Sequence, residues 1–170
     1  MIKDIQSTLQ GKPFLANKKE IIALLNTLLT SSIASSITKE RVGIAFSGGV
    51  DSTILAHLYN QHSKNYTLYT VGLEGSKDLE QAAIVALKMK FPLKIRIITK
   101  QEALDIIDDV TMILDEAGLD PNPIDIAIAS VIYAALLMAR KDNMTTLLYG
   151  LGMDSIFAGF EHHTNYKKDF

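Results

Sequence analysis

The sequence has no cysteine among its 170 residues. This absence excludes a disulfide framework, and it excludes zinc and iron–sulfur centres held by cysteine thiolates. An excess of positive charge is also missing: 17 Lys and Arg residues stand against 19 Asp and Glu residues, which gives a net charge of −2 and a pI of about 6.1. The chain therefore has no basic field that would hold a nucleic acid backbone.

The hydropathy pattern of the sequence also indicates neither a signal peptide nor a membrane span. Residues 1–4 (MIKD) do not open a secretory signal, and the longest apolar stretch, residues 124–138, carries Asp125 near its start. This stretch is shorter than the roughly 18 to 20 residues of a transmembrane helix. We therefore expect a cytoplasmic protein in which residues 124–138 form a helix buried inside the domain.

The apolar share of 48% is enough for one substantial core. We expect a single domain over residues 1–170, with residues 1–16 as an N-terminal extension. Apolar runs predict strands and capping patterns predict helices, and the two alternate along the chain. Such alternation is typical of an α/β fold with a Rossmann-like parallel sheet covered by helices on both faces. Strands are expected at residues 42–46, 66–71, 93–98 and 145–149, and helices from Lys18, over 51–60, from Ser76 to about Lys90, from Thr99 to about Glu116, over 124–138 and over 153–159.

The most informative stretch is the apolar run VGIAF at residues 42–46 followed by SGGVDS at residues 47–52. It predicts a buried strand, a tight loop and the start of a helix. Paired glycines permit positive φ and let a ligand approach the backbone, and the first N–H groups of the helix point to the same place. We predict an anion-binding loop formed by Ser47, Gly48, Gly49, Val50 and Ser52.

Asp51 lies within this loop, where its carboxylate would repel a phosphate unless a cation lay between them. A divalent metal, most simply Mg²⁺, would bridge Asp51 and the phosphate oxygens. No Gly-Lys-Ser/Thr follows the glycines, so this is not a Walker loop. The structural alternative is a glycine turn that only joins a strand to a helix.

The loop SGGVDS resembles the SGG-x-DS loop of the PP-loop ATP pyrophosphatases (adenine nucleotide alpha hydrolase superfamily), which split ATP into AMP and pyrophosphate while adenylating a substrate. Two further stretches resemble the C-terminal synthetase domain of asparagine synthetases. They are TVGLEGSKD at residues 70–78, and LYGLGMDSIFAGF at residues 148–160, which is similar to L-S-G-E-G-x-D-E-x-F-G-G-Y. The three motifs occur in the family's order over about residues 20–160.

This resemblance implies ATP and Mg²⁺ as cofactors and the adenylation of a small-molecule carboxylate, followed by amide formation. It implies that Asp51 and Asp154 act as the catalytic, metal-holding pair, and that the Val71 backbone meets the adenine. Gly150 and Gly152 would contact the nucleotide, Gly150 near the ribose or α phosphate. Ammonia would come from elsewhere or from a separate glutaminase, and a homodimer that covers the apolar helices is left open.

Several residues depart from the family pattern. Leu151 replaces the acidic residue that acts on the acyl-adenylate and the incoming amine, and a leucine cannot transfer a proton. Tyr149 and Ser155 replace a serine and a second acid, and the substrate-reading arginine falls on Ala127. The sequence also has no glutaminase domain. Lys167 or Lys168 could stand in for the pyrophosphate-binding lysine, but a flexible C-terminal pair without this role is the favoured alternative.

Three functions therefore stay open from the sequence. The first is an asparagine synthetase-like, AMP-forming ligase without the glutaminase domain. The second is a degenerate or non-catalytic module or subunit that binds ATP or AMP, which the loss of the acid at Leu151 favours. The third is tRNA modification, in which the same loop adenylates a base carbonyl. The acidic pI and the missing cysteines argue against this third function. The missing cysteines also argue against the sulfur-transferring relatives of this loop family.

Overall fold

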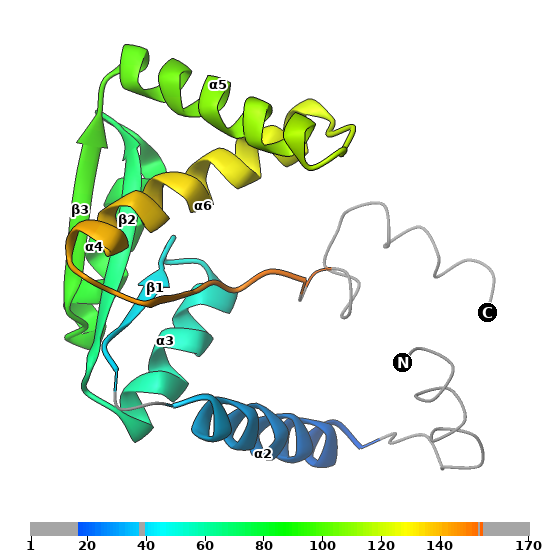
Figure 1. The fold of residues 1–170 in the computed structure, drawn as a ribbon. Helices are drawn as coiled ribbons and strands as arrows, with labels where there is room; N and C mark the ends of the chain where they lie inside the picture. Colours follow the sequence, from blue (N-terminus) through cyan, green and yellow to red (C-terminus); the bar gives the residue numbers. More distant parts are fainter. Residues whose placement is uncertain (1–16, 38–39, 153, 155–170) are drawn as a thin grey trace, which may run out of the picture. The chain divides into compact units, whose positions relative to one another are not determined.

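The computed structural model describes residues 17–37, 40–152 and 154, which fall into two units divided after Ser36 (Figure 1). The first unit contributes α2 (Lys18–Ser36) to the described residues. The Oδ1 atom of Asn17 accepts a hydrogen bond from the Lys19 N–H at 2.9 Å, so the start of this helix is as predicted. The N-terminal extension lies outside the described residues, and the single domain stays a prediction.

The second unit contains a parallel sheet of four strands in the order β3-β2-β1-β4. The predicted Rossmann-like α/β fold is thereby confirmed. The last expected helix, residues 153–159, lies outside the described residues except for Asp154. The strands are β1 (Val42–Ala45), β2 (Tyr66–Leu73), β3 (Leu93–Ile98) and β4 (Thr146–Leu148), and the helices are α3 (Val50–His62), α4 (Lys77–Met89), α5 (Lys100–Glu116) and α6 (Pro123–Lys141).

Helices cover both faces of this sheet, with α6 in front of it and α4 behind it in Figure 1. The side chains of neighbouring residues on a strand point to opposite faces. Accordingly, Val71 on β2 packs near Ala134 of α6, whereas a Cβ on Gly72 would lie 3.0 Å from Leu79 of α4. The strands of such a covered sheet read as nearly continuous apolar runs, as β1 does.

The order of the strands determines where a ligand can bind. From β1 the chain proceeds through α3 to β2 and through α4 to β3, and it then returns through α5 and α6 to β4 on the other side of β1. The connections therefore change direction between β1 and β4. In open parallel sheets a ligand binds outside the carboxyl ends of the strands at this point.

α6 is buried along one side only, so the expectation of a helix wholly inside the domain is corrected. Ala134 is 2% exposed and packs on the sheet side, whereas Ile124 is 70% exposed. An apolar run of this length predicts a helix, but it does not predict which side of the helix packs against another element. By length and composition alone, α6 is the one helix among the described residues that could cross a membrane, as a core helix of a soluble protein also could.

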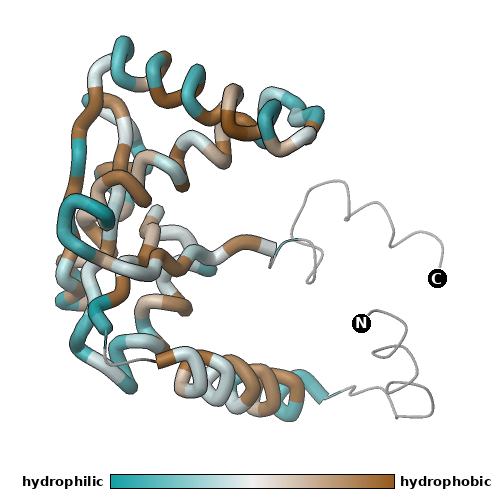
Figure 2. The backbone as a smooth tube through the Cα atoms, in the orientation of Figure 1, coloured by the Kyte–Doolittle hydropathy of each residue, from teal (hydrophilic) through white to brown (hydrophobic). Residues whose placement is uncertain are grey.

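α5 shows the more usual amphipathic pattern, with brown and teal alternating along it in Figure 2. The helix predicted from Thr99 begins with a capping box. The Thr99 hydroxyl accepts from the Glu102 N–H at 3.1 Å, and the Glu102 carboxylate accepts from the Thr99 N–H at 2.8 Å. The start of α5 is therefore fixed right after the last residue of β3.

Candidate functional site

The glycine loop after β1 is pressed against α4. Gly48 has φ +73°, and a Cβ at this residue would lie 2.9 Å from backbone atoms of Ala82 and Gln81. Both the conformation and the space therefore require glycine. The Gln81 side-chain amide also donates to the Gly48 C=O at 3.5 Å, a contact that no sequence signal indicated.

Two serine hydroxyls hold the loop in shape. The Ser52 hydroxyl, on a side chain that is nearly buried, donates to the Gly49 C=O at 3.2 Å and accepts from the Ser47 N–H at 3.3 Å. The Ser47 hydroxyl lies 3.2 Å from the Ser52 hydroxyl and accepts from the Gly49 N–H at 3.2 Å. Both hydroxyls thus bond within the loop, and their predicted contacts with phosphate stay predictions.

The first turn of α3 opens into this loop. Gly49 is the N-cap residue, and no side chain of the described residues caps the helix. The first backbone bond of the helix runs from the Thr53 N–H to the Gly49 C=O, so the N–H groups of Val50, Asp51 and Ser52 have no acceptor inside the helix. Together with the positive end of the helix dipole, they favour an anion at this position.

The segment that leaves β4 meets the same helix turn. A Cβ on Gly150 would lie 3.2 Å from the Cβ of Asp51 and 3.3 Å from the Ser52 N, so Gly150 lies directly against the first turn of α3. Two motifs about a hundred residues apart in the sequence are thus neighbours, as the parallel sheet requires. Gly152, with φ +93°, and the exposed Asp154 follow on the same segment.

A metal site made by protein ligands alone is not present in the part of the chain that the structure describes. No group of three or more His, Cys, Asp or Glu side chains there could hold an ion. Mg²⁺ in nucleotide sites is often held by only one or two carboxylates, with phosphate oxygens and waters completing the shell. Asp51 and Asp154 carry hard oxygen ligands of this kind, and their predicted role as the ligands of Mg²⁺ stays a prediction.

The main chain of Val71 is open on the side of β1. The Phe46 N–H donates to the Tyr69 C=O at 2.9 Å, and the ladder between β1 and β2 ends there. Consecutive residues on a strand direct their main-chain groups to opposite neighbours, so Val71 faces the same side as Tyr69. The Phe46 C=O accepts a hydrogen bond from the Thr70 hydroxyl at 2.5 Å, which the sequence did not indicate.

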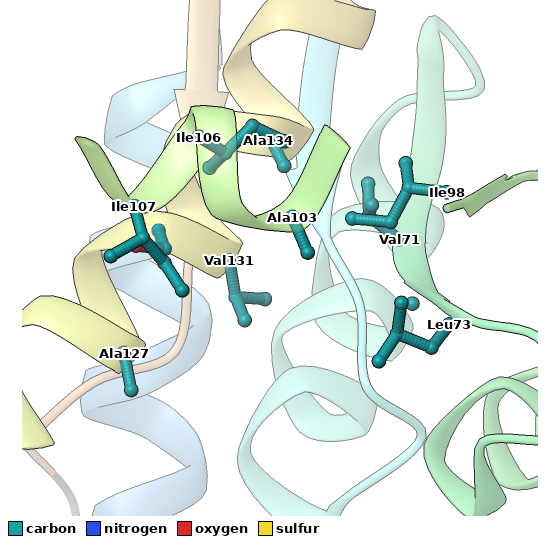
Figure 3. A pocket seen from close by; sticks show the side chains of 11 residues that line it. Val71, Leu73, Ile98, Ala103, Ile106, Ile107, Ala127, Val131 and Ala134 are labelled. Carbon is teal, nitrogen blue, oxygen red and sulfur yellow. The ribbon is translucent and has the colours of Figure 1, made fainter. Parts of the chain in front are cut away.

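Beside Val71 lies a cavity of about 220 Å³, between the ends of β2 and β3 and the helices α5 and α6 (Figure 3). Its lining is almost wholly apolar, and the Ser130 hydroxyl is already bonded to the Ile126 C=O at 2.7 Å. This lining suits an apolar group and offers few side-chain partners for a polar one. The lining residues are Val71, Gly72, Leu73, Ile98, Ala103, Ile106, Ile107, Ala127, Ser130, Val131 and Ala134.

A parallel sheet with a glycine loop at its switch point, joined there by a second glycine segment, defines the PP-loop class of α/β proteins. The asparagine synthase family model matches residues 24–169. The chain therefore belongs to the asparagine synthase family.

Known relatives of this chain are much longer proteins. A Methanocaldococcus jannaschii protein, provisionally named glutamine-hydrolyzing asparagine synthetase 1, is 35% identical over 124 residues, which are 73% of this chain and 22% of that protein. A Mycobacterium bovis protein with a similar provisional name is 27% identical over 147 residues, which are 85% of this chain and 21% of that protein. The chain thus spans about a fifth of the length of both relatives.

A solved structure supports the same fold. The NH3-dependent NAD synthetase of Campylobacter jejuni superposes with a TM-score of 0.51 at 15% identity, covering 79% of this chain and 60% of that chain. At this identity the likeness concerns the fold alone.

Proposed function

We propose that this chain is an AMP-forming ligase that binds ATP with Mg²⁺ and adenylates a small-molecule carboxylate. The amide would form when an amine, supplied as ammonia or by a separate glutaminase, displaces AMP. The observation that carries the proposal is the approach of Gly150 to Asp51 and Ser52, because it brings the two nucleotide motifs to one helix terminus. Family membership supports the same reaction class.

The loop would hold the phosphates by its backbone. The N–H groups of Val50, Asp51 and Ser52 and the helix dipole favour the negative charge of the pyrophosphate that leaves. Gly48 lets the loop pack against α4, and Gly49 adds no side chain that would block the approach of the pyrophosphate. These groups are fixed before the substrate arrives, so they need no reorganisation during the reaction.

Asp51 and Asp154 are the residues that would hold Mg²⁺, one from each side of the switch point. When bound, the ion would neutralise phosphate charge and orient the α phosphate. The chain's own contribution would be to carry one carboxylate on the segment after β1 and the other on the segment after β4, so that the nucleotide would lie between them.

The adenine would be read by the main chain of Val71, which is open toward β1, with the apolar cavity beside it taking the ring. Gly150 would then lie near the ribose or the α phosphate, with Gly152 after it. The carboxylate to be activated would approach from the open side of the loop. Its oxygen would attack the α phosphorus in line with the departing pyrophosphate.

The test is an assay with ATP labelled at the α phosphate, with and without Mg²⁺, over a panel of carboxylates plus ammonia, in which AMP is separated from ADP. We expect AMP that depends on both the carboxylate and Mg²⁺, and we expect Asp51→Asn to abolish it. Asp109→Asn, an exposed change on α5, is the matched control. Unchanged AMP formation in Asp51→Asn would remove the metal role.

Leu151 supports a second function, a nucleotide-binding module that makes no amide. The side chain at this position is exposed and cannot transfer a proton. Leu151→Glu separates the two functions. If the variant makes more amide than the natural sequence, the site is a synthetase that has lost its acid; if only nucleotide binding changes, the module is favoured.

A further inference from the structure

α6 presents two neighbouring stripes to two different cavities. One stripe lines the cavity beside Val71, as described above. The other lines a second cavity of about 480 Å³. Both stripes have the i, i+3, i+4, i+7 spacing of a helix face. They are Ala127, Ser130, Val131 and Ala134 for the first cavity, and Asp125, Ile128, Ala129 and Ile132 for the second.

The second cavity has apolar walls that come from three parts of the second unit. α6 forms one wall, the end of α5 and the loop after it form a second wall, and Leu151 forms the third. Leu151 is 56% exposed and Ile128 is 42% exposed, so apolar side chains face an open cavity of a size typical of ligand sites. The residues from α5 and its loop are Leu114, Leu119, Asp120 and Pro121.

This cavity adjoins the nucleotide loop through a single residue. Leu151 follows Gly150, which lies against Asp51 in the first turn of α3. A molecule in the cavity is therefore next to the place where an acyl-adenylate would lie. The residue that replaces the family's amine-handling acid is thus itself part of the cavity wall.

The charged side chains that line the cavity indicate which kind of ligand it can bind. Among the described residues, the charged side chains of its lining are two carboxylates, Asp120 and Asp125. Asp125 accepts a long hydrogen bond of 3.4 Å from the Asn122 N–H, which leaves lone pairs for a further donor. Two carboxylates attract an ammonium group and repel a carboxylate substrate. Apolar walls with acidic residues among them suit an amine that carries an apolar substituent.

We propose that this cavity binds the amine substrate, and that this substrate is a primary amine with an apolar substituent rather than ammonia. The proposal rests on the function proposed above, which supplies the acyl-adenylate. The amine nitrogen forms a bond to the acyl carbon, and the bond from that carbon to the phosphate oxygen breaks. The bound ammonium first loses one proton to Asp125 or to water, which frees the lone pair that makes the bond to the acyl carbon. AMP leaves with the electron pair of the broken bond, and the nitrogen releases its second proton to water.

Calorimetry with the full chain and no nucleotide tests the binding, with n-hexylamine, methylamine and hexanoate as probes. We expect hexylamine to bind at least about tenfold more tightly than methylamine, since each buried methylene contributes about fourfold. Equal affinity of the two amines, or tighter binding of hexanoate, would overturn the proposal.

A pair of variants on α6 locates the site. Ile128→Ser removes an apolar side chain from the cavity wall, whereas Ile124→Ser makes the same change on the same helix outside the lining. We expect only Ile128→Ser to weaken hexylamine binding, by about tenfold or more. Equal effects of the two variants would show that hexylamine binds elsewhere.

The labelled-ATP assay then separates this proposal from the one on which it rests. Carboxylate-dependent AMP together with an N-hexyl amide supports both. AMP and amide with ammonia but none with hexylamine would overturn the apolar acceptor and leave the ligase standing. No AMP under any condition would overturn the ligase and the acceptor role together, even if hexylamine still bound.

Discussion

At the scale of single residues, the site depends on two glycines that have different constraints. Gly48 needs a positive φ and has backbone atoms of α4 where a side chain would be. Gly150 has an ordinary φ and only lacks space, because Asp51 and Ser52 lie 3.2–3.3 Å from its missing Cβ. A Cβ there is tolerated only if the β4 exit and the loop move apart by a few tenths of an ångström.

We expect Gly150→Ala to lower the affinity for MgATP by about tenfold, or about 1.4 kcal/mol, because that shift spoils the alignment of the two motifs. Gly118→Ala is the control. Gly118 has φ +70° and no heavy atom within 4 Å of its missing Cβ, so its loss costs stability through the backbone but leaves nucleotide binding unchanged. Isothermal titration measures both variants, and equal affinities would show that Gly150 does not touch the site.

The residues of the loop itself could be predicted from the sequence, whereas the residues that pack around it could not. The SGG loop, and Asp51 at a helix start, follow from the local sequence because strand, glycines and helix are consecutive. The neighbours of the loop, Gln81 and Thr70, are polar residues inside other elements, and only tertiary packing brings them there. Likewise, no local pattern says that Ser52 bonds within its own loop.

At the scale of elements, one carboxylate joins the end of α6 to two strands. Asp142 is the C-cap residue of α6, and its Oδ2 atom accepts from the Tyr69 hydroxyl and from the Lys94 ammonium, each at 2.6 Å. The hydrogen bonds from Lys94 and then Tyr69 hold the pKa of Asp142 below its ordinary value. Burial, followed by the bond to Asp142, raises the pKa of Tyr69, so this hydroxyl stays protonated.

This contact predicts a loss of stability in acid. Since the folded pKa of Asp142 is lowered, its contribution is present above the unfolded value of about 3.9 and is lost as the pH falls through the folded pKa. Tyr69→Phe removes one bond and should cost about 1 kcal/mol at pH 7, and less at pH 3. Urea unfolding at both pH values measures the difference, with Asp109→Asn as the control; an equal cost at pH 3 and pH 7 would contradict the assignment.

The positions of the helices and strands in the sequence were largely predictable, but the way they pack on one another was not. β3 begins and ends at the predicted residues, and the start of α5 follows from consecutive residues that form a capping box. The capping box of Asn122 and Asp125 at the start of α6 was not predicted. α6 is different, since its apolar run continues around the helix and gives no sign of which side packs on the sheet. Part of its exposed side lines the second cavity, although the apolar sequence pattern alone predicts that this side is core.

At the scale of the whole molecule, the strand order brings residues from both halves of the chain to one edge of the sheet. The predicted parallel sheet was sufficient to place the loop after β1 and the segment after β4 together. Any ligand bound there contacts both segments, so it stabilises the folded chain as a whole.

We therefore expect MgATP at 100 times its Kd to add about 2.7 kcal/mol to the free energy of unfolding. For a chain of this size, that corresponds to a rise in Tm of about 5 to 10 °C. Removal of the metal by a chelator should cut the rise, and Asp51→Asn should make the remaining rise insensitive to the chelator. A rise that is the same with and without Mg²⁺ in the natural sequence would argue against a metal-assisted site.

The hydrogen bond from the Thr70 hydroxyl to the Phe46 carbonyl has a consequence for the sheet itself. That carbonyl is the acceptor that the Val71 N–H would use if the ladder between β1 and β2 continued by one more residue. The Thr70 hydroxyl takes one lone pair of this oxygen, and the ladder between β1 and β2 ends at Phe46. The N–H donor and the C=O acceptor of Val71 therefore lie in fixed positions at the edge of the sheet. A base with complementary groups could pair with them in the place that a further residue of β1 would take.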